Sequence, residues 1–202
     1  MKFSFKRITV IATIFSLTTS FLPSCKQTSS TLNNQKITNS EIADMDNFAQ
    51  AKAYYTGNGV EQNFQRALGL YKKVAQQGHL EAQHMAGVMY YRGEGTNQNY
   101  KKSIKWYRKA LENDFAPAQF NLGVMYTKGR GVPQDYKIAA DWYEKSAIQG
   151  YAPAQHNLGT FYRDGKGVTQ NYATAMKWFK KAAAQGDNLS PLMIATMYRG
   201  GE

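Results

Sequence analysis

Few side chains in this 202-residue chain could serve as nucleophiles or general bases, because it has only three histidines and one cysteine. One acyl-transfer chemistry needs a lysine one helical turn after a serine, in the pattern S-x-x-K, so that the amine lies beside the hydroxyl. The residues three positions after the serines beyond residue 100 are Trp106, Gln149 and Met193, so the pattern is absent there. Spacing alone defines no Ser/His/Asp arrangement either. The sequence therefore predicts a protein that is not an enzyme.

Metal and nucleotide sites are not favoured by the spacing of the other polar residues. His84 and His156 fall in different units of a repeat, so we expect them to be too far apart to share a metal ion, and no other His, Cys, Asp or Glu cluster has metal-ligand spacing. Glycine pairs such as Gly129/Gly131 lack the third glycine and the Lys-Ser/Thr of phosphate-binding loops. We expect no metal and no cofactor, and a structural role for these histidines and glycines.

The glycine pairs instead mark an internal repeat with a constant step of 36 residues. The pairs are Gly57/Gly59, Gly93/Gly95, Gly129/Gly131 and Gly165/Gly167. A tyrosine precedes each pair by three residues and recurs once more, giving Tyr54, Tyr90, Tyr126, Tyr162 and Tyr198. Self-similarity at one fixed period over most of a chain is typical of a stacked repeat protein.

Residues 116–150 show what one unit contains. Its first segment has apolar residues at helical spacing, accepts Pro117 in the first turn, and ends at Gly129, which can take the left-handed conformation of a helix C-terminus. Gly123 leaves room for a neighbouring helix to approach closely. The second segment starts after a residue that can cap a helix, and the equivalent residues of the four units are Asn63, Asn99, Asp135 and Asn171. Each unit is therefore expected to be a helix pair, A then B, which buries its apolar faces only by stacking on its neighbours.

The repeated string A-x-A-x-x-x-L-G-x-x-Y-x-x-G-x-G-V-x-x-x-Y-x-x-A-x-x-W-Y-x-x-A-A-x-x-G resembles the Sel-one-like repeat (SLR), a relative of the tetratricopeptide repeat. The tetratricopeptide signature falls on Leu122, Gly123, Tyr126, Ala139, Tyr143 and Ser146. The resemblance implies an all-α fold, a right-handed α-solenoid of stacked helix-turn-helix repeats, which binds protein partners and has no chemistry of its own. The expected repeats are 41–78 (an N-terminal cap), 79–114, 115–150 and 151–186, followed by a partial repeat, 187–202, with helix A only. That last helix is either a lid or the start of a longer array.

The tetratricopeptide relatives bind partners with A-helix side chains that face a concave groove. Carried over one position at a time, this implies three rows. The first row is Phe48, His84, Phe120, His156 and Leu192; the second is Lys52, Val88, Val124, Thr160 and Thr196; the third is Tyr55, Tyr91, Thr127, Arg163 and Arg199. Within these rows the candidate partner-binding residues are Phe48, Tyr55, His84, Tyr91, Phe120, Val124, Thr127, His156, Thr160 and Arg163. The rings of the first row suit an extended peptide with apolar side chains, and the alternative is that they pack between helices of the array.

The first 24 residues differ from the rest and are typical of an export signal. Lys2, Lys6 and Arg7 precede an apolar run, 8–22, that is too short for a membrane span. Leu22-Pro23-Ser24-Cys25 resembles a bacterial lipobox, although proline replaces the usual small residue, and implies a lipidated Cys25 followed by a flexible tether over 25–40. The expected location is the bacterial envelope, on the periplasmic side of an outer membrane if the cell has one. The alternative is an incidental cysteine in a secreted or periplasmic soluble protein.

Basic residues concentrate on the expected B helices. Without the first 24 residues the formal charge falls from +11 to +8. The B-helix cations are Lys72, Lys73, Lys101, Lys102, Lys105, Arg108, Lys109, Lys137, Lys145, Lys177, Lys180 and Lys181. One interpretation is a solvated outer wall; the other is attraction to an anionic envelope lipid or polymer. We do not expect nucleic acid as a partner, because an exported chain would not meet it.

Overall fold

The computed structural model describes residues 46–201, which belong to one compact unit of the chain. They contain nine α-helices and no strand. The predicted signal segment, Cys25, the tether and the beginning of the first repeat lie outside the described residues.

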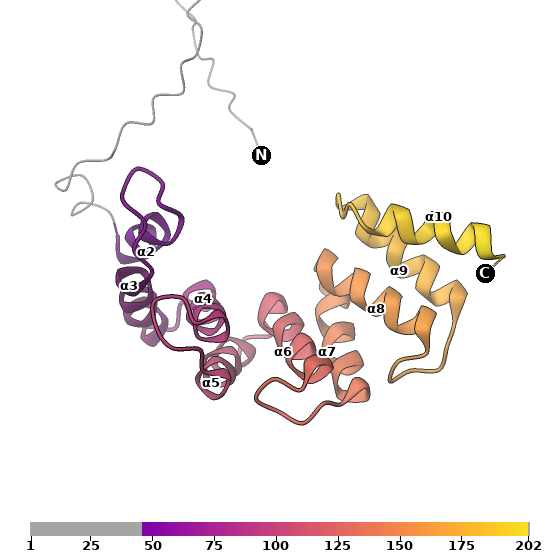
Figure 1. The fold of residues 1–202 in the computed structure, drawn as a ribbon, viewed down its shortest axis with the longest axis horizontal. Helices are drawn as coiled ribbons and strands as arrows, with labels where there is room; N and C mark the ends of the chain where they lie inside the picture. Colours follow the sequence, from indigo (N-terminus) through magenta and orange to yellow (C-terminus); the bar gives the residue numbers. More distant parts are fainter. Residues whose placement is uncertain (1–45, 202) are drawn as a thin grey trace, which may run out of the picture. The chain divides into compact units, whose positions relative to one another are not determined.

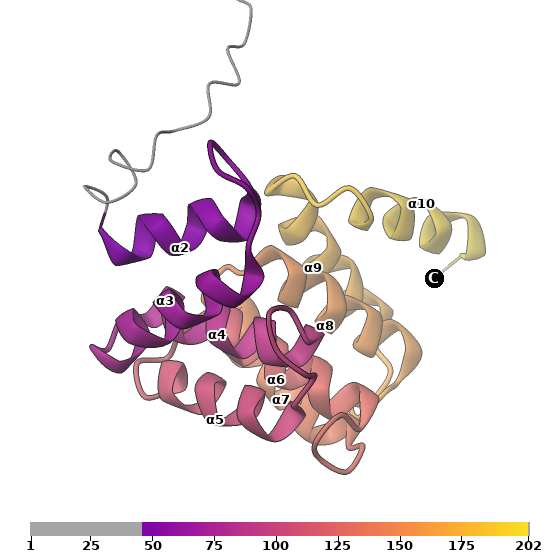
Figure 2. The same cartoon turned by 60° about the vertical axis from the view of Figure 1, so that its left-hand side comes forward.

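The helices alternate between two kinds along the chain, and each kind recurs with the predicted period. The A helices are α2 (Asn47–Thr56), α4 (Leu80–Arg92), α6 (Ala116–Lys128), α8 (Ala152–Asp164) and α10 (Ser190–Gly200). The B helices are α3 (Phe64–Gln76), α5 (Tyr100–Leu111), α7 (Tyr136–Ile148) and α9 (Tyr172–Ala184). Each A helix packs on its own B helix, which packs in turn on the next A helix (Figures 1 and 2). The predicted all-α solenoid of stacked helix pairs is confirmed.

The B helices start where their capping residues predict. The side chain of Asp135 accepts a hydrogen bond from the backbone N–H of Ile138 at 2.9 Å, and Asn63, Asn99 and Asn171 cap α3, α5 and α9 in the same way. Each cap satisfies one of the free N–H groups at the helix start. The four caps therefore define the same boundary in every unit.

In the second, third and fourth elbows the two glycines have different roles, a division that the sequence interpretation did not make. The first one ends the A helix: Gly165 has φ +67°, and its N–H donates to the carbonyl of Phe161. The second, Gly167, also has a left-handed φ of +68°, but it lies against the first turn of the preceding unit's B helix. A Cβ on Gly167 would overlap the carbonyl oxygen of Tyr136. The elbow is therefore both a turn and a contact between consecutive repeats.

A third glycine, inside each of the A helices α4, α6 and α8, sets how closely the helices of one pair approach. A Cβ on Gly123 would lie 2.6 Å from the ring of Tyr143, and Gly87 and Gly159 face Tyr107 and Phe179 in the same manner. The predicted close approach at Gly123 is confirmed. Because position 123 has no side chain, the ring of Tyr143 can approach the backbone of α6 closely.

The apolar core is divided into clusters that join each B helix to the following A helix. In one of them, Ile104 and Tyr107 of α5 are buried with Leu122 and Met125 of α6. In the last, Met197 of α10 is buried against two residues of α9, Ala175 and Phe179. The partial fifth repeat therefore covers the apolar face of α9, while its own Leu192 and Tyr198 are 53% and 65% exposed.

The first two units depart locally from the repeat. In the first, α2 begins at Asn47 because the side chain of Asp46 caps it, accepting the N–H of Ala49 at 2.7 Å. In the second, Asp114 takes a left-handed φ of +51° at the place where other units have a glycine, such as Gly150. Aspartate tolerates this conformation better than most side chains. Of all consecutive helices, α5 and α6, which this turn joins, pack together least extensively.

Candidate functional site

The first predicted row lies between helices, with each ring partly buried. Phe48 stacks on His79 at a centroid distance of 4.3 Å, and Phe120 contacts the rings of Tyr143 and Tyr151 at 5.8 and 5.4 Å. Each ring therefore touches its own B helix or the residue that precedes the next A helix. These contacts favour the packing interpretation for the buried side of the row. Because each ring is only partly buried, its exposed edge can still contact a partner on the surface of the A helices.

His84 is held in this row as a neutral side chain. Its ring lies 5.9 Å from that of Tyr107 and 5.7 Å from that of Phe115. Burial among these groups lowers the pKa of His84 to about 4. The neutral Nε2 can then accept the hydrogen bond from the side-chain amide of Asn121 on the next A helix, at 2.7 Å. The predicted structural role of His84 fits these contacts.

His156 occupies the same row two units later but has polar partners. Its Nδ1 is 3.0 Å from Oγ of Ser190 and 3.1 Å from the carboxylate of Asp187. Ser190 is the first residue of α10 and Asp187 lies three residues before it, so these contacts connect α8 to the last helix. The two histidines do not meet, and no group of three or more potential metal ligands occurs within residues 46–201.

The third row forms hydrogen bonds that run from one A helix to the next. Arg92 of α4 donates to the hydroxyl of Tyr55 on α2 at 3.2 Å, and Arg130, just after α6, donates to the hydroxyl of Tyr91 on α4. Further along, the guanidinium of Arg163 lies against Sδ of Met193. Arg92 and Arg130 were not predicted. No sequence signal could have found them, because they do not occupy equivalent positions in their units.

The remaining predicted residues, Val124, Thr127 and Thr160, are partly buried. Thr127 donates to the carbonyl of Gly123 and lies 3.1 Å from the hydroxyl of Tyr143, so it belongs to the packing within its repeat. Thr160 donates to the carbonyl of His156 in its own helix. Val124 is partly exposed and packs at the margin of an apolar cluster.

One hollow occurs beside the first row, at its N-terminal end. It has a volume of about 270 Å³, and Phe48, Val74 and His79 line it together with Asp46, Asn47 and Gln77. The structure thus brings the first row next to a surface depression in the first repeat.

A sequence model of the Sel1 repeat matches residues 49–79, 80–115, 116–151 and 152–187. The chain belongs to the Sel1 repeat family. Proteins with Sel1 repeats are generally scaffolds for protein–protein interaction and are typically not enzymes. A search of curated proteins found no match.

Solved Sel1 repeat structures share this fold. A protective antigen of uropathogenic Escherichia coli with an SLR fold is 38% identical, with a TM-score of 0.71 over 77% of this chain and 33% of that one. A Sel1 repeat protein from Oxalobacter formigenes is 31% identical, with a TM-score of 0.72 over 77% of this chain and 64% of that one. Helicobacter pylori cysteine rich protein B is 25% identical, with a TM-score of 0.53 over 66% of this chain and 96% of that one. The chain thus spans a third to two thirds of the first two relatives.

The Sel1 chain differs from a cysteine-rich relative in how it can be stabilised. With a single cysteine, its 202 residues cannot form an internal disulfide. No helix within residues 46–201 is long and apolar enough to cross a membrane.

Proposed function

We propose that this chain is an envelope-anchored scaffold that binds an extended segment of a protein partner along its A-helix face. The A-helix face comprises the three rows defined above, with the addition of Arg92 and Arg130. Its roles would be envelope assembly, signalling or contact with a host cell. The general role of Sel1 repeat proteins as interaction scaffolds supports the class of partner.

The observation that carries the proposal is the way the face is held in place before any partner arrives. Arg92 and Arg130 each link a tyrosine of the preceding A helix, and Asn121 links His84. Side chains fixed in this way lose less conformational entropy on binding, which favours affinity. Tyrosine and arginine are also the residues that contribute most often to binding hot spots.

The partner's contacts follow from the chemistry of these side chains. The partly exposed rings of Tyr55, Tyr91 and Phe120 offer apolar edges, and the guanidinium groups beside the two tyrosines can donate hydrogen bonds to carboxylates or backbone carbonyls of a partner. An extended peptide with alternating apolar and acidic or amide side chains would match this pattern.

Photo-crosslinking in the native cell tests where the partner binds. One probe replaces Val124, which is partly exposed on the A-helix face; Phe120 is less suitable because its ring packs between two tyrosines. The matched probe replaces Lys145 on the B helix of the same repeat. We expect a discrete protein adduct at position 124 and none at 145. Adducts at 145 alone, particularly with lipid or glycan, would contradict the proposal and favour the basic B-helix wall.

The envelope anchor rests on the sequence of the first 25 residues and is tested separately. Two or more acyl chains on Cys25 hold a protein firmly at a membrane. Intact-mass measurement should find a chain that begins at residue 25 and carries acyl groups, and Cys25→Ala should move the protein from the membrane fraction to the soluble one. An unmodified soluble protein cleaved elsewhere would show that the anchor is wrong and leave the scaffold proposal standing.

A further inference from the structure

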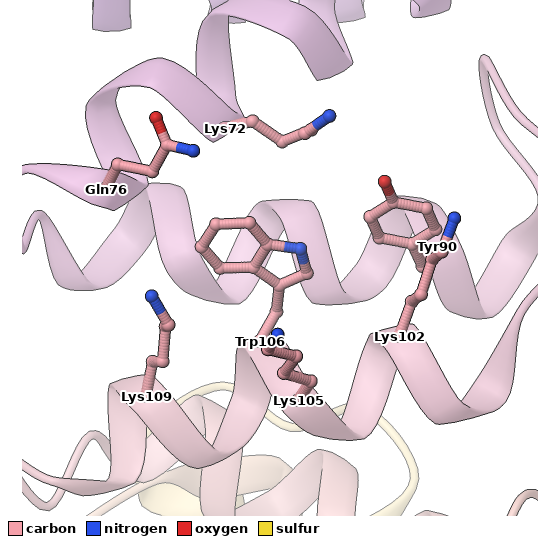
Figure 3. A pocket seen from close by; sticks show the side chains of 7 residues that line it. All are labelled: Lys72, Gln76, Tyr90, Lys102, Lys105, Trp106 and Lys109. Atoms are coloured by element: carbon pink, nitrogen blue, oxygen red, sulfur yellow. The ribbon is translucent and has the colours of Figure 1, made fainter.

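A second hollow lies where the first repeat meets the second. Its volume is about 340 Å³, and side chains of α3, α4 and α5 line it (Figure 3). We call it the lysine cavity; its lining residues are Lys72, Gln76, Tyr90, Lys102, Lys105, Trp106 and Lys109. Figure 3 shows the indole of Trp106 rising from α5 between Lys109 and Lys102, with Lys72 above it on α3.

The lining carries four positive charges and no carboxylate. Within residues 46–201, none of the four lysines takes part in a salt bridge. Two of them lie over aromatic rings: Lys102 Nζ is 5.4 Å from the ring centroid of Tyr90, and Lys109 Nζ is 5.1 Å from that of Trp106. Such cation–π contacts orient the ammonium groups without neutralising them. Within residues 46–201, the positive charge of the cavity is therefore not neutralised by any salt bridge.

The repeat itself shows that packing does not require these lysines. At the next junction the tryptophan and its lysine recur as Trp142 and Lys145, with Nζ 4.7 Å from the ring centroid. They recur again as Trp178 and Lys181, where this distance is 4.4 Å. At the next junction Arg108 keeps a cation at the position of Lys72, but Lys102 and Lys105 are replaced by Ile138 and Asp141, and Gln76 by Glu112. One junction further, Lys105 recurs as Lys177, whereas Lys72 and Lys102 are replaced by Glu144 and Thr174. The Trp–Lys contact thus belongs to the fold, while the full set of four lysines without a carboxylate occurs at this junction alone.

We propose that the lysine cavity binds a ligand carrying two or more phosphate groups on a small body. Lysine is a compact positive charge that binds phosphate oxygens, and several lysines around one hollow match a ligand with several negative charges. The volume exceeds that of a single phosphate and lies in the range of small-ligand pockets. A free oligophosphate and the headgroup of a doubly phosphorylated lipid share this chemistry. The site does not depend on partner binding at the A-helix face.

Titration with tripolyphosphate tests the site in a chain whose only tryptophan is Trp106, made by Trp142→Phe and Trp178→Phe. The emission of Trp106 should change in a saturable way. Lys102→Gln with Lys105→Gln should weaken the apparent affinity by about tenfold or more, because two charge-assisted contacts are lost. The matched control, Lys73→Gln with Lys101→Gln, removes the same charge from α3 and α5, two of the helices that line the cavity, at positions outside the lining, and should leave the affinity nearly unchanged. Equal loss in both variants, or no saturable binding, would overturn the proposal.

The next junction offers a complementary gain of binding. Ile138→Lys, Asp141→Lys and Glu112→Gln give it an equivalent lining, with Arg108 in the place of Lys72, and all three positions are exposed, so the fold should tolerate them. With Trp142 as the single tryptophan, the emission should then respond to tripolyphosphate, whereas the unmodified junction should not. A response without these substitutions would mean that the Trp–Lys pair alone binds the anion, and the cavity would lose its special role.

Vesicles separate the two sources of phosphate. Phosphatidylcholine vesicles with and without cardiolipin, whose headgroup has two phosphates, are mixed with the unmodified chain and both glutamine variants. Cardiolipin-dependent binding that needs Lys102 and Lys105 would assign the cavity to a lipid headgroup. Tripolyphosphate binding that needs them, together with vesicle binding that does not, would assign it to a soluble phosphate compound.

Discussion

Gly167→Ala is expected to lower the free energy of unfolding of the repeat array by about 2–5 kcal/mol. Two costs combine at this position. The left-handed φ of +68° disfavours any L side chain, and the new methyl group would overlap the carbonyl oxygen of Tyr136 in the preceding repeat. That oxygen belongs to the first turn of α7 and cannot move without disturbing the helix start. The substitution would therefore strain the turn and the junction between the third and fourth repeats together.

Gly165→Ala, in the same elbow, carries only the first of these costs. Gly165 has almost the same φ, +67°, but a Cβ there would meet only the side chain of Gln170, at 3.3 Å. It should lower the free energy of unfolding by about 1–2 kcal/mol, the cost of the left-handed conformation alone. Urea unfolding followed by far-UV circular dichroism gives both values. Equal destabilisation by the two substitutions would show that the contact with α7 contributes nothing.

Acid should weaken the array through His84, by up to about 3 kcal/mol between neutral pH and pH 4. An unfolded histidine has a pKa of about 6.5, whereas burial lowers the pKa of folded His84 to about 4. Above pH 6.5 the ring is neutral in both states and costs nothing. As the pH falls from 6.5 towards 4, the unfolded chain takes up a proton that the folded chain does not, so the free energy of unfolding falls. Below pH 4 this contribution becomes constant.

His84→Phe is the natural control, because Phe48 and Phe120 fill the same place in the neighbouring units. The variant loses the hydrogen bond to Asn121, so it should be less stable at neutral pH. The difference in stability between the unmodified chain and the variant should shrink as the pH falls from 6.5 to 4. Urea unfolding at four pH values in this range measures it, and other acidic groups cancel in the comparison. A difference that stays constant would mean that His84 is protonated equally in both states.

Features that depend on neighbours in the sequence could be predicted from it. Asp135 caps α7 because its side chain reaches an N–H group only three residues away, and Gly129 ends α6 through its own backbone freedom. Because the repeat has a constant period, the same assignments apply to the equivalent residues of the other units. The close approach at Gly123 could also be predicted, because a glycine and an aromatic residue recur at the same spacing in three units and meet within one unit.

Features that depend on contacts between units could not be predicted in the same way. Gly167 was interpreted as part of a turn, because the backbone that it touches lies in the preceding unit. The lysine cavity draws on three helices, and along the sequence its lysines merge with the other cations of the B helices. The A-helix rows were placed on the correct helices by resemblance, but burial, which decides between packing and binding at Phe120, comes only from the position of Tyr151 in the next unit.

The division of the core into clusters between neighbours has a consequence for how such chains can change in length. Deleting residues 100–135, one full period, would join Asn99 to Tyr136, so a capping residue would again precede a B helix, and every other repeat would keep its usual neighbours. Duplicating a period would act in the same way. The A-helix face can therefore grow or shrink in whole steps during evolution, without a new interface having to arise each time. The lysine cavity would not be duplicated in this way. A copied third or fourth repeat would extend the A-helix face but would not add a second lysine cavity.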